Sequence, residues 1–222
     1  FDPGKTKSGS DEIDLKTTKN VKWAAKLGSQ SYGNPTIYQG KVFVGTNNAA
    51  PRDPGIAGDK GVLMCFRESD GKFLWQHTNQ KLSDPAADWP QQGVCSSPLV
   101  EGDRLYYVSN RGELVCLDTE GFTDGKNDGP YQDEAYKGTT DGDIIWMLDM
   151  MKEMAGKGKP GDKAGQQAGV GFDPVPQVLD AQVLVGGGAQ HRAHVQQRAL
   201  AGTVGPQQGN DLPFLDIQGD TL

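Results

Sequence analysis

Two stretches near the end of the chain carry residue types that bind metals or nucleotides in other proteins. His191-Arg192-Ala193-His194 places two imidazoles three positions apart, so both would lie on one face of a helix. A zinc protease needs H-E-x-x-H and a third ligand, and this stretch has neither. In Leu184–Ala189 three glycines follow an apolar run, but a dinucleotide site needs G-x-G-x-x-G at the start of a helix. We therefore expect neither a metal nor a nucleotide at these stretches.

Aspartates in glycine-rich segments form a third set of candidates. Asp124 to Gly129 (D-G-K-N-D-G) is partly similar to a calcium-binding loop, but it lacks the alternating ligands and the closing Glu of an EF-hand. Because Asp favours turns on its own account, we predict solvated turn residues and no metal site. The aspartates in question are Asp53, Asp59, Asp124, Asp128, Asp141 and Asp143.

The fourth candidate is a loop that combines an aromatic ring with amide side chains. Trp89, Gln91 and Gln92 precede a predicted strand, and ligands often bind on loops held by a rigid scaffold. These three residues are our candidates for a ligand-binding rim, although no cofactor is assigned to them. The alternative is that Trp89 only packs between neighbouring sheets. No residue is assigned a catalytic role.

The elements that position this loop begin at Cys95. Residues 97–100, 104–109 and 113–118 are predicted strands, joined by turns at Glu101-Gly102-Asp103 and at Asn110-Arg111-Gly112. The later strands have apolar neighbours, such as Tyr106-Tyr107, instead of a strict alternation of apolar and polar residues. A strand that is apolar on both sides is covered on both sides, so we expect sheets packed on both faces.

The same pattern occurs earlier in the chain, at residues 34–75. Equivalent prolines are 63 positions apart, equivalent cysteines 51 and equivalent tryptophans 71, because insertions at 49–60 and 122–142 fall at different turns. Insertions at turns with the strands preserved are typical of a repeat architecture. Each copy, 34–75 and 97–146, is predicted to supply four strands. Trp23, Trp75 and Trp146 would then be in register and pack between neighbouring units.

The repeated pattern S-P-x-V, then G-x-L-x-[CA]-L-D, then G-x-x-x-W resembles the repeat of the pyrroloquinoline-quinone-like (PQQ-like) β-propellers. Residues 91–98 through 149–153 are similar to a subgroup of envelope proteins from planctomycete-type bacteria. The resemblance implies an all-β fold, a partial β-propeller of four-stranded antiparallel blades over residues 21–154. It also implies a periplasmic or cell-envelope location, with any signal peptide outside the chain shown.

Composition excludes some classes of partner. The net charge is −7, whereas binding to nucleic acid needs a basic surface. No apolar run approaches the roughly 18 residues that cross a bilayer. The cysteines are three in number and none has a C-x-x-C partner, so we interpret them as small buried hydrophobic residues. Residues 1–20 are polar and are predicted to form a loose leader segment.

Amino-acid usage changes abruptly after about residue 155. Between Lys157 and Leu222 there is no Trp, Tyr, Cys, Met, Ser or Glu, and the repeat pattern stops. Two explanations remain open for residues 155–222, an irregular low-complexity tail or a segment translated from a shifted reading frame. Residues 178–185 alternate in part and are predicted to form a strand.

Two functions are compatible with this resemblance. Quinone-dependent alcohol or sugar dehydrogenases bind PQQ and calcium on the propeller axis, often beside a disulfide between adjacent cysteines, and this chain has no adjacent cysteine pair. Other members of the superfamily use the same repeat only for protein contacts. We therefore expect a non-catalytic binding or scaffold protein of the cell envelope, with envelope proteins or a small ligand at the rim as partners. A dehydrogenase fragment is the alternative.

Overall fold

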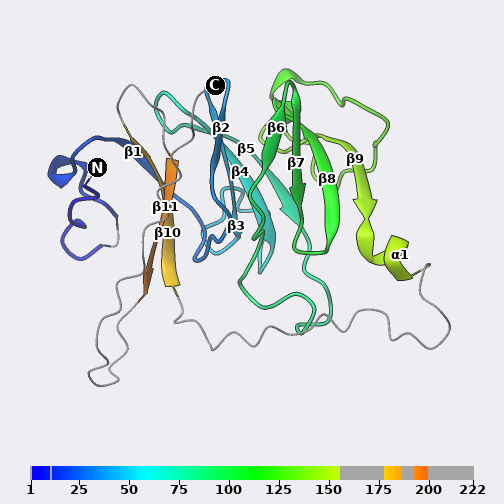
Figure 1. Ribbon diagram of the computed structural model, residues 1–222, viewed down its shortest axis with the longest axis horizontal. Helices are drawn as coiled ribbons and strands as arrows, with labels where there is room; N and C mark the ends of the chain where they lie inside the picture. The colour runs from blue at the N-terminus through cyan, green and yellow to red at the C-terminus, as the bar shows by residue number, and fades with distance from the viewer. Residues whose placement is uncertain (1, 11, 156–177, 187–192, 200–222) are drawn as a thin grey trace, which may run out of the picture.

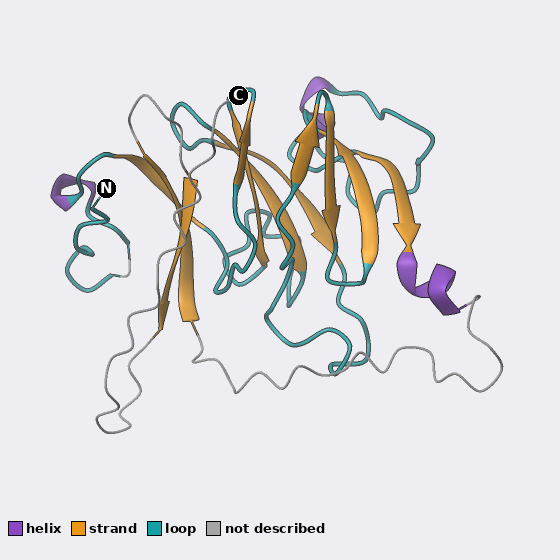
Figure 2. Ribbon diagram, viewed as in Figure 1, coloured by secondary structure: helices purple, strands orange, loops and turns teal. Residues whose placement is uncertain are grey.

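Three antiparallel sheets lie side by side and make up nearly all of the regular structure (Figures 1 and 2). This computed structural model describes residues 2–10, 12–155, 178–186 and 193–199. The predicted all-β class is confirmed, and the one α-helix among these residues is α1 (Met150–Ala155).

Each of the two predicted copies forms its own four-stranded sheet, in the order of the chain. Gly102, with a φ of 62°, makes the tight turn between the first two strands of the second sheet, as its freedom from a Cβ allows. The first sheet consists of β2 (Thr36–Tyr38), β3 (Lys41–Asn47), β4 (Gly61–Arg67) and β5 (Phe73–Asn79). The second consists of β6 (Leu99–Glu101), β7 (Arg104–Val108), β8 (Glu113–Asp118) and β9 (Ile144–Asp149).

The strand register shows that the two sheets are copies of one module. Cys65 pairs with Trp75 across β4 and β5, and the equivalent Cys116 pairs with Trp146 across β8 and β9. A register shift follows each cysteine at the same point. Since register is set by which side chains each face must bury, this identity means that the two copies use their faces in the same way.

Aromatic pairs on one face repeat as well. The rings of Phe43 and Trp75 are 5.9 Å apart at 49°, and those of Tyr106 and Trp146 are 6.0 Å apart at 47°. These are equivalent positions in the two modules, and their spacing is within the favourable range for aromatic pairs. The duplication predicted from the sequence is therefore confirmed in geometry as well as in strand order.

Two hydrophobic clusters, one on each face of the first sheet, hold the sheets together. One lies between the first sheet and β1 (Val21–Lys26), and the other lies between the two four-stranded sheets. The first sheet is thus covered on both faces, as predicted. The first cluster contains Trp23, Ala25, Leu27, Val42, Val44, Val62, Met64 and Phe66, and the second contains Phe43, Leu63, Cys65, Trp75, Val94, Leu105, Tyr107, Val115, Leu117 and Ile144.

A tryptophan at the equivalent position of successive sheets fastens each sheet to the next. The indole N–H of Trp23 donates to Glu68 O at 2.7 Å, and that of Trp75 donates to Thr119 O at 3.1 Å. Gly71 has a φ of 73°, and a Cβ there would lie 2.6 Å from the Trp23 ring, so the ring needs a glycine beneath it. The packing role predicted for Trp23 and Trp75 is confirmed, and it includes a hydrogen bond that the sequence did not indicate.

The outer face of the second sheet departs from the prediction. Trp146 is 37% exposed and Leu148 is 42% exposed, and Leu99 and Val108 are exposed on the same sheet. The expectation that sheets cover both faces of this module, and that Trp146 packs between sheets, is therefore wrong among the described residues. The apolar pattern of β7 and β8 is real, but the face toward the first sheet is buried whereas the outer face is largely open, with Cys116 buried on it.

The cysteines are all free thiols, and two of the three follow the prediction. Cys65 and Cys116 are buried, whereas Cys95 is exposed. Cys95 lies in the connection that leads into β6, outside any strand, so it has no sheet face to bury it. Burial raises the pKa of the Cys65 thiol, which keeps it protonated and unreactive at neutral pH.

The third sheet combines a strand from the early part of the chain with two strands from its late part. Its order is β1, β10 (Val178–Gly186), β11 (Ala193–Ala199), so the strand predicted at 178–185 is confirmed. The leader segment folds back on itself through bridges between Asp2 and Lys19 and between Thr6 and Ile13, with a short 3₁₀ helix at Leu15–Thr17. A second short 3₁₀ helix, Gly121–Asp124, lies in the insertion before β9.

Candidate functional site at the rim

Equivalent asparagines tie the ends of the strands together at one rim of the sheets. Asn47, which ends β3, accepts from Ser29 N at 2.9 Å and donates to Ser29 Oγ at 2.8 Å. Asn110, which follows β7, donates to Gln80 O at 3.1 Å. Each asparagine thus bonds to the segment just after the strand that precedes its own sheet along the chain, β1 for Asn47 and β5 for Asn110, and each fixes the position of the loop that leaves that strand.

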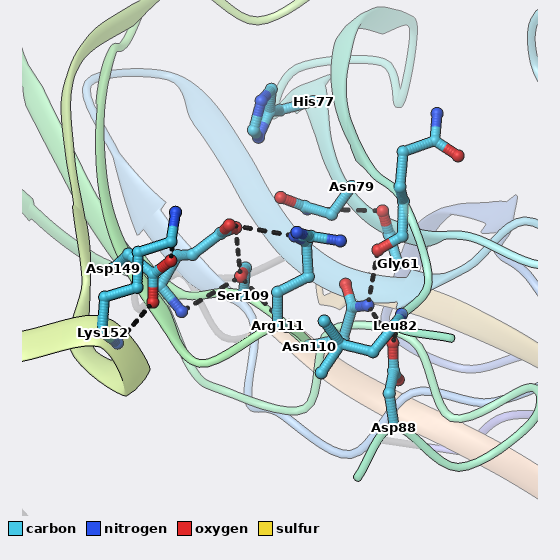
Figure 3. A network of polar contacts seen from close by, with 12 residues as sticks. Gly61, His77, Asn79, Leu82, Asp88, Ser109, Asn110, Arg111, Asp149 and Lys152 are labelled. Atoms are coloured by element: carbon cyan, nitrogen blue, oxygen red, sulfur yellow. Dashed lines mark hydrogen bonds and ion pairs between the residues drawn. The ribbon is translucent and has the colours of Figure 1, made fainter. Parts of the chain in front are cut away.

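Asp88 is the centre of the second of these networks (Figure 3). Its side chain is buried, and Oδ2 accepts from Asn110 Nδ2 at 2.7 Å and from Leu82 N at 2.9 Å. Oδ1 forms an ion pair with Lys81, whose Nζ also donates to Trp89 O at 2.7 Å. A buried carboxylate with several donors is well satisfied, so this network holds the loop between β5 and β6 in one conformation.

The predicted rim residues lie on this loop. Trp89 is 43% exposed among the described residues. Gln91 adopts a positive φ of 64°; its N–H donates to Asp59 Oδ2 at 2.6 Å, and its carbonyl accepts from Asn47 Nδ2. Gln92 N donates to Trp89 O at 3.3 Å. The backbone is held while the Trp89 ring faces solvent, which is the geometry of a preformed contact residue, and ligand binding there stays a prediction.

A buried histidine and tyrosine join the two modules behind the rim. His77 Nδ1 lies 2.5 Å from the hydroxyl of Tyr107, and Asn79 Nδ2 donates to that hydroxyl at 3.0 Å. Burial lowers the pKa of His77 to about 4 and raises the pKa of Tyr107. At neutral pH both groups are therefore uncharged, and neither is poised for proton transfer. Their role is to connect β5 with β7.

Sequence reasoning did not identify His77, Asn79 or Tyr107. One feature of the sequence did indicate them. His77 stands two positions after Trp75, at the repeat position where the second module has the apolar Leu148. A polar side chain at a buried repeat position needs a partner from the neighbouring module.

Glu113 fixes the neighbouring turn between β7 and β8, which carries Ser109 and Arg111 (Figure 3). This carboxylate is buried, accepts from Ser109 Oγ at 3.0 Å and pairs with Arg111 Nε at 2.9 Å. Both oxygens are used, so the group stabilises the turn and offers no free ligand atom.

The predicted aspartates divide into two groups. Those in turns behave as expected, since Asp53 Oδ1 accepts from Gly55 N at 2.7 Å and Asp124 Oδ1 accepts from Lys126 N at 2.9 Å. Asp141 and Asp143 are buried, so their assignment as solvated residues is wrong. The insertion before β9 folds back onto β5, where Gln76 N donates to Thr140 O, and this contact removes both aspartates from water.

Asp143 is the most perturbed of these carboxyl groups. It is 0% exposed, and Oδ2 accepts from Asp128 N at 2.7 Å while Oδ1 has no partner. Burial raises its pKa to about 6, and the nearby carboxylates of Glu134 and Asp128 add to this effect. Among the described residues, no group of three or more His, Cys, Asp or Glu side chains is arranged to hold a metal ion.

Some of the residues considered from the sequence lie outside the part of the chain that the structure describes. Gly187 to Ala189, His191 and Arg192 lie outside the described residues, as do 156–177 and 200–222. In the described part of the chain, no helix has the length and apolar character needed to span a bilayer.

Two modules with the same strand order, register and aromatic pair define a repeat protein of antiparallel four-stranded sheets. Residues 12–121, which include β1 through β8, match the family described as outer membrane protein assembly factor BamB. The chain therefore carries the PQQ-like repeat of that family. The narrower likeness to planctomycete-type envelope proteins stays a prediction. No curated protein matches the chain.

Proposed function

We propose that this chain is a non-catalytic binding or scaffold protein of the bacterial cell envelope, in which the repeat forms part of a β-propeller. The description of the matched family, an outer membrane protein assembly factor, supports an envelope location and a role in protein contacts. The main support is structural, and it comes from the outer face of the second sheet.

This outer face is built as a contact surface. Leu99, Tyr106, Cys116 and Trp146 form one row across β6 to β9, because each is the register partner of the next. In the first module the equivalent face is covered by the second sheet and contributes to the cluster between them. The partner that fits is therefore a further four-stranded module of the same repeat, with its own apolar rows facing this one.

Trp146 specifies what the partner must offer. Its two equivalents, Trp23 and Trp75, each donate the indole N–H to a backbone carbonyl in the turn region of the next sheet. Among the described residues there is no acceptor for Trp146. A partner module would supply a carbonyl at the turn after its third strand, as Glu68 and Thr119 do here.

Site-specific photo-crosslinking in the full-length gene product tests the proposal. A photoreactive residue at Leu148 would lie on the proposed contact face, and one at Ser69, an exposed turn position of the first module, is the matched control. We expect crosslinks from position 148 at least fivefold above those from position 69, to peptides of another four-stranded module or of an envelope protein. Equal yields at the two positions, or crosslinks only between copies of this chain, would contradict the proposal.

The alternative is a fragment of a quinone-dependent dehydrogenase, and the repeat family is its only support. In that case PQQ and calcium would be its cofactors. The complete protein would be reconstituted with quinone and calcium and assayed for dye reduction with alcohols and sugars. Turnover in this assay would replace the scaffold proposal, and a lack of turnover would remove the dehydrogenase.

A further inference from the structure

A small cavity lies between β5 and the insertion that precedes β9. Its volume is about 20 Å³, which is room for one water molecule or one ion. Most of its lining is polar. The lining residues are Gln76, His77, Thr78, Glu134, Ala135, Tyr136, Asp141 and Gly142.

Two of the lining side chains carry oxygens without a hydrogen-bond partner. Gln76 is 2% exposed, and its Nε2 donates to Thr78 Oγ1 at 3.1 Å while its Oε1 has no partner. Glu134 is 9% exposed, and its Oε1 also has no partner. Buried oxygens of this kind cost free energy unless a donor or a cation reaches them. Both residues line the same cavity.

The charges around the cavity favour a cation as its occupant. Asp141 adds a second buried carboxylate, which accepts from Gly138 N at 2.7 Å through Oδ2. Lys137 reaches Glu134 from the other side, 3.4 Å from Oε2, and Asn127 donates to the same oxygen at 3.3 Å. Neither of these donors contacts Oε1.

We propose that this cavity is a cation site, in which Gln76 Oε1, Glu134 Oε1 and the Asp141 carboxylate bind a hard cation such as Ca²⁺. One amide and two carboxylates are oxygen ligands of the kind that calcium takes. Mg²⁺ fits less well because it demands near-ideal octahedral geometry and loses its water reluctantly. The site depends on neither the scaffold role nor a quinone.

Thermal unfolding of the full chain tests the site, after treatment with EDTA and then with CaCl₂. With a Kd of about 10⁻⁴–10⁻³ M, as in other weak protein calcium sites, 5 mM Ca²⁺ should raise Tm by about 3–7 °C. Glu134→Gln should weaken binding at least tenfold and reduce this shift to less than half. The control Asp133→Asn changes an exposed carboxylate one position away and should leave the shift unchanged.

A second measurement needs no variant that alters the ligands. Tyr136 lines the cavity, so Tb³⁺ bound there should show luminescence sensitised by its ring, and Ca²⁺ should displace it. Tyr136→Phe should reduce this emission at least fivefold. Absence of any Tm shift up to 10 mM Ca²⁺ together with absence of sensitised emission would overturn the proposal and leave a single water as the occupant. A Glu134→Gln variant that responds like the unaltered chain would overturn it equally.

Discussion

The equivalent tryptophans permit a comparison within one chain between a covered and an uncovered module. Trp75 is 0% exposed, and its indole donates to Thr119 O at 3.1 Å. Trp146 has the same place in the next module but is 37% exposed. The substitution of each by Phe removes the same atoms from the same position of the repeat. The difference between the two changes in the free energy of unfolding therefore measures how much burial by the neighbouring sheet contributes.

The structure sets the expected magnitudes. Trp75→Phe leaves the carbonyl of Thr119 without its donor, which costs about 1–3 kcal/mol when the acceptor is buried. The smaller ring also leaves a void, for about 1 kcal/mol more. We expect the free energy of unfolding to fall by about 2–4 kcal/mol. For Trp146→Phe we expect a change within about 0.5 kcal/mol, as at other surface positions.

Thermal unfolding followed by far-UV circular dichroism is the suitable assay, because it does not depend on tryptophan emission. The loss at Trp75 corresponds to a Tm decrease of about 5–12 °C for a chain of this size. Trp23→Phe should behave like Trp75→Phe, since Trp23 is 5% exposed and donates to Glu68 O at 2.7 Å. If Trp146→Phe were as damaging as Trp75→Phe in dilute, monomeric protein, the outer face would be covered within the single chain and the reasoning would be refuted.

Three further predictions follow from buried or exposed groups described above. The pKa of Asp143 is raised to about 6 from 3.8, so the folded state holds its proton more tightly and stability should fall as pH rises from about 4 to about 6. In urea titrations, Asp143→Asn should therefore raise the free energy of unfolding by about 2 kcal/mol at pH 8 and by little at pH 4. An equal effect at both pH values would contradict this prediction. In the same assay, Gly61→Ala should lower the free energy of unfolding by about 2–4 kcal/mol, because a Cβ there would lie 1.9 Å from Asn110 Oδ1. A neutral effect would show that Asn110 moves freely and would contradict the prediction. The chain alone should self-associate through the exposed outer face of the second sheet, and Leu148→Lys should shift its sedimentation toward that of a monomer. An unaltered chain that is monomeric at 100 μM would refute this self-association.

The repeat allowed much of the fold to be predicted from sequence. Equivalent positions such as Cys65 and Cys116 must sit at equivalent places in the strand register, because a shift of one residue would turn every apolar side chain to the wrong face. Turn chemistry supplied the strand ends, as at Gly102. The strand order and the all-β class followed from these two sources.

The burial of each face could not be predicted in the same way. The residues around Trp146 are as apolar as those around Trp75, but burial depends on what lies opposite, and local sequence does not encode the neighbour. The loop that carries Trp89 was predicted correctly, and its role as a ligand-binding rim stays a prediction. The network that holds this loop, centred on Asp88, depends on contacts between distant segments, which neither spacing nor composition reveals.

The pairing of β1 with β10 has a consequence for synthesis of the chain. Ala24 is the register partner of Leu184, about 160 positions further along. At a translation rate of roughly 5–20 residues per second, β1 leaves the ribosome some 8–30 s before β10 exists. During that interval one edge of the first strand has unpaired amide and carbonyl groups, which are a template for any other extended chain nearby. A chaperone that binds extended segments would therefore have its clearest target near residues 21–26 of the nascent chain.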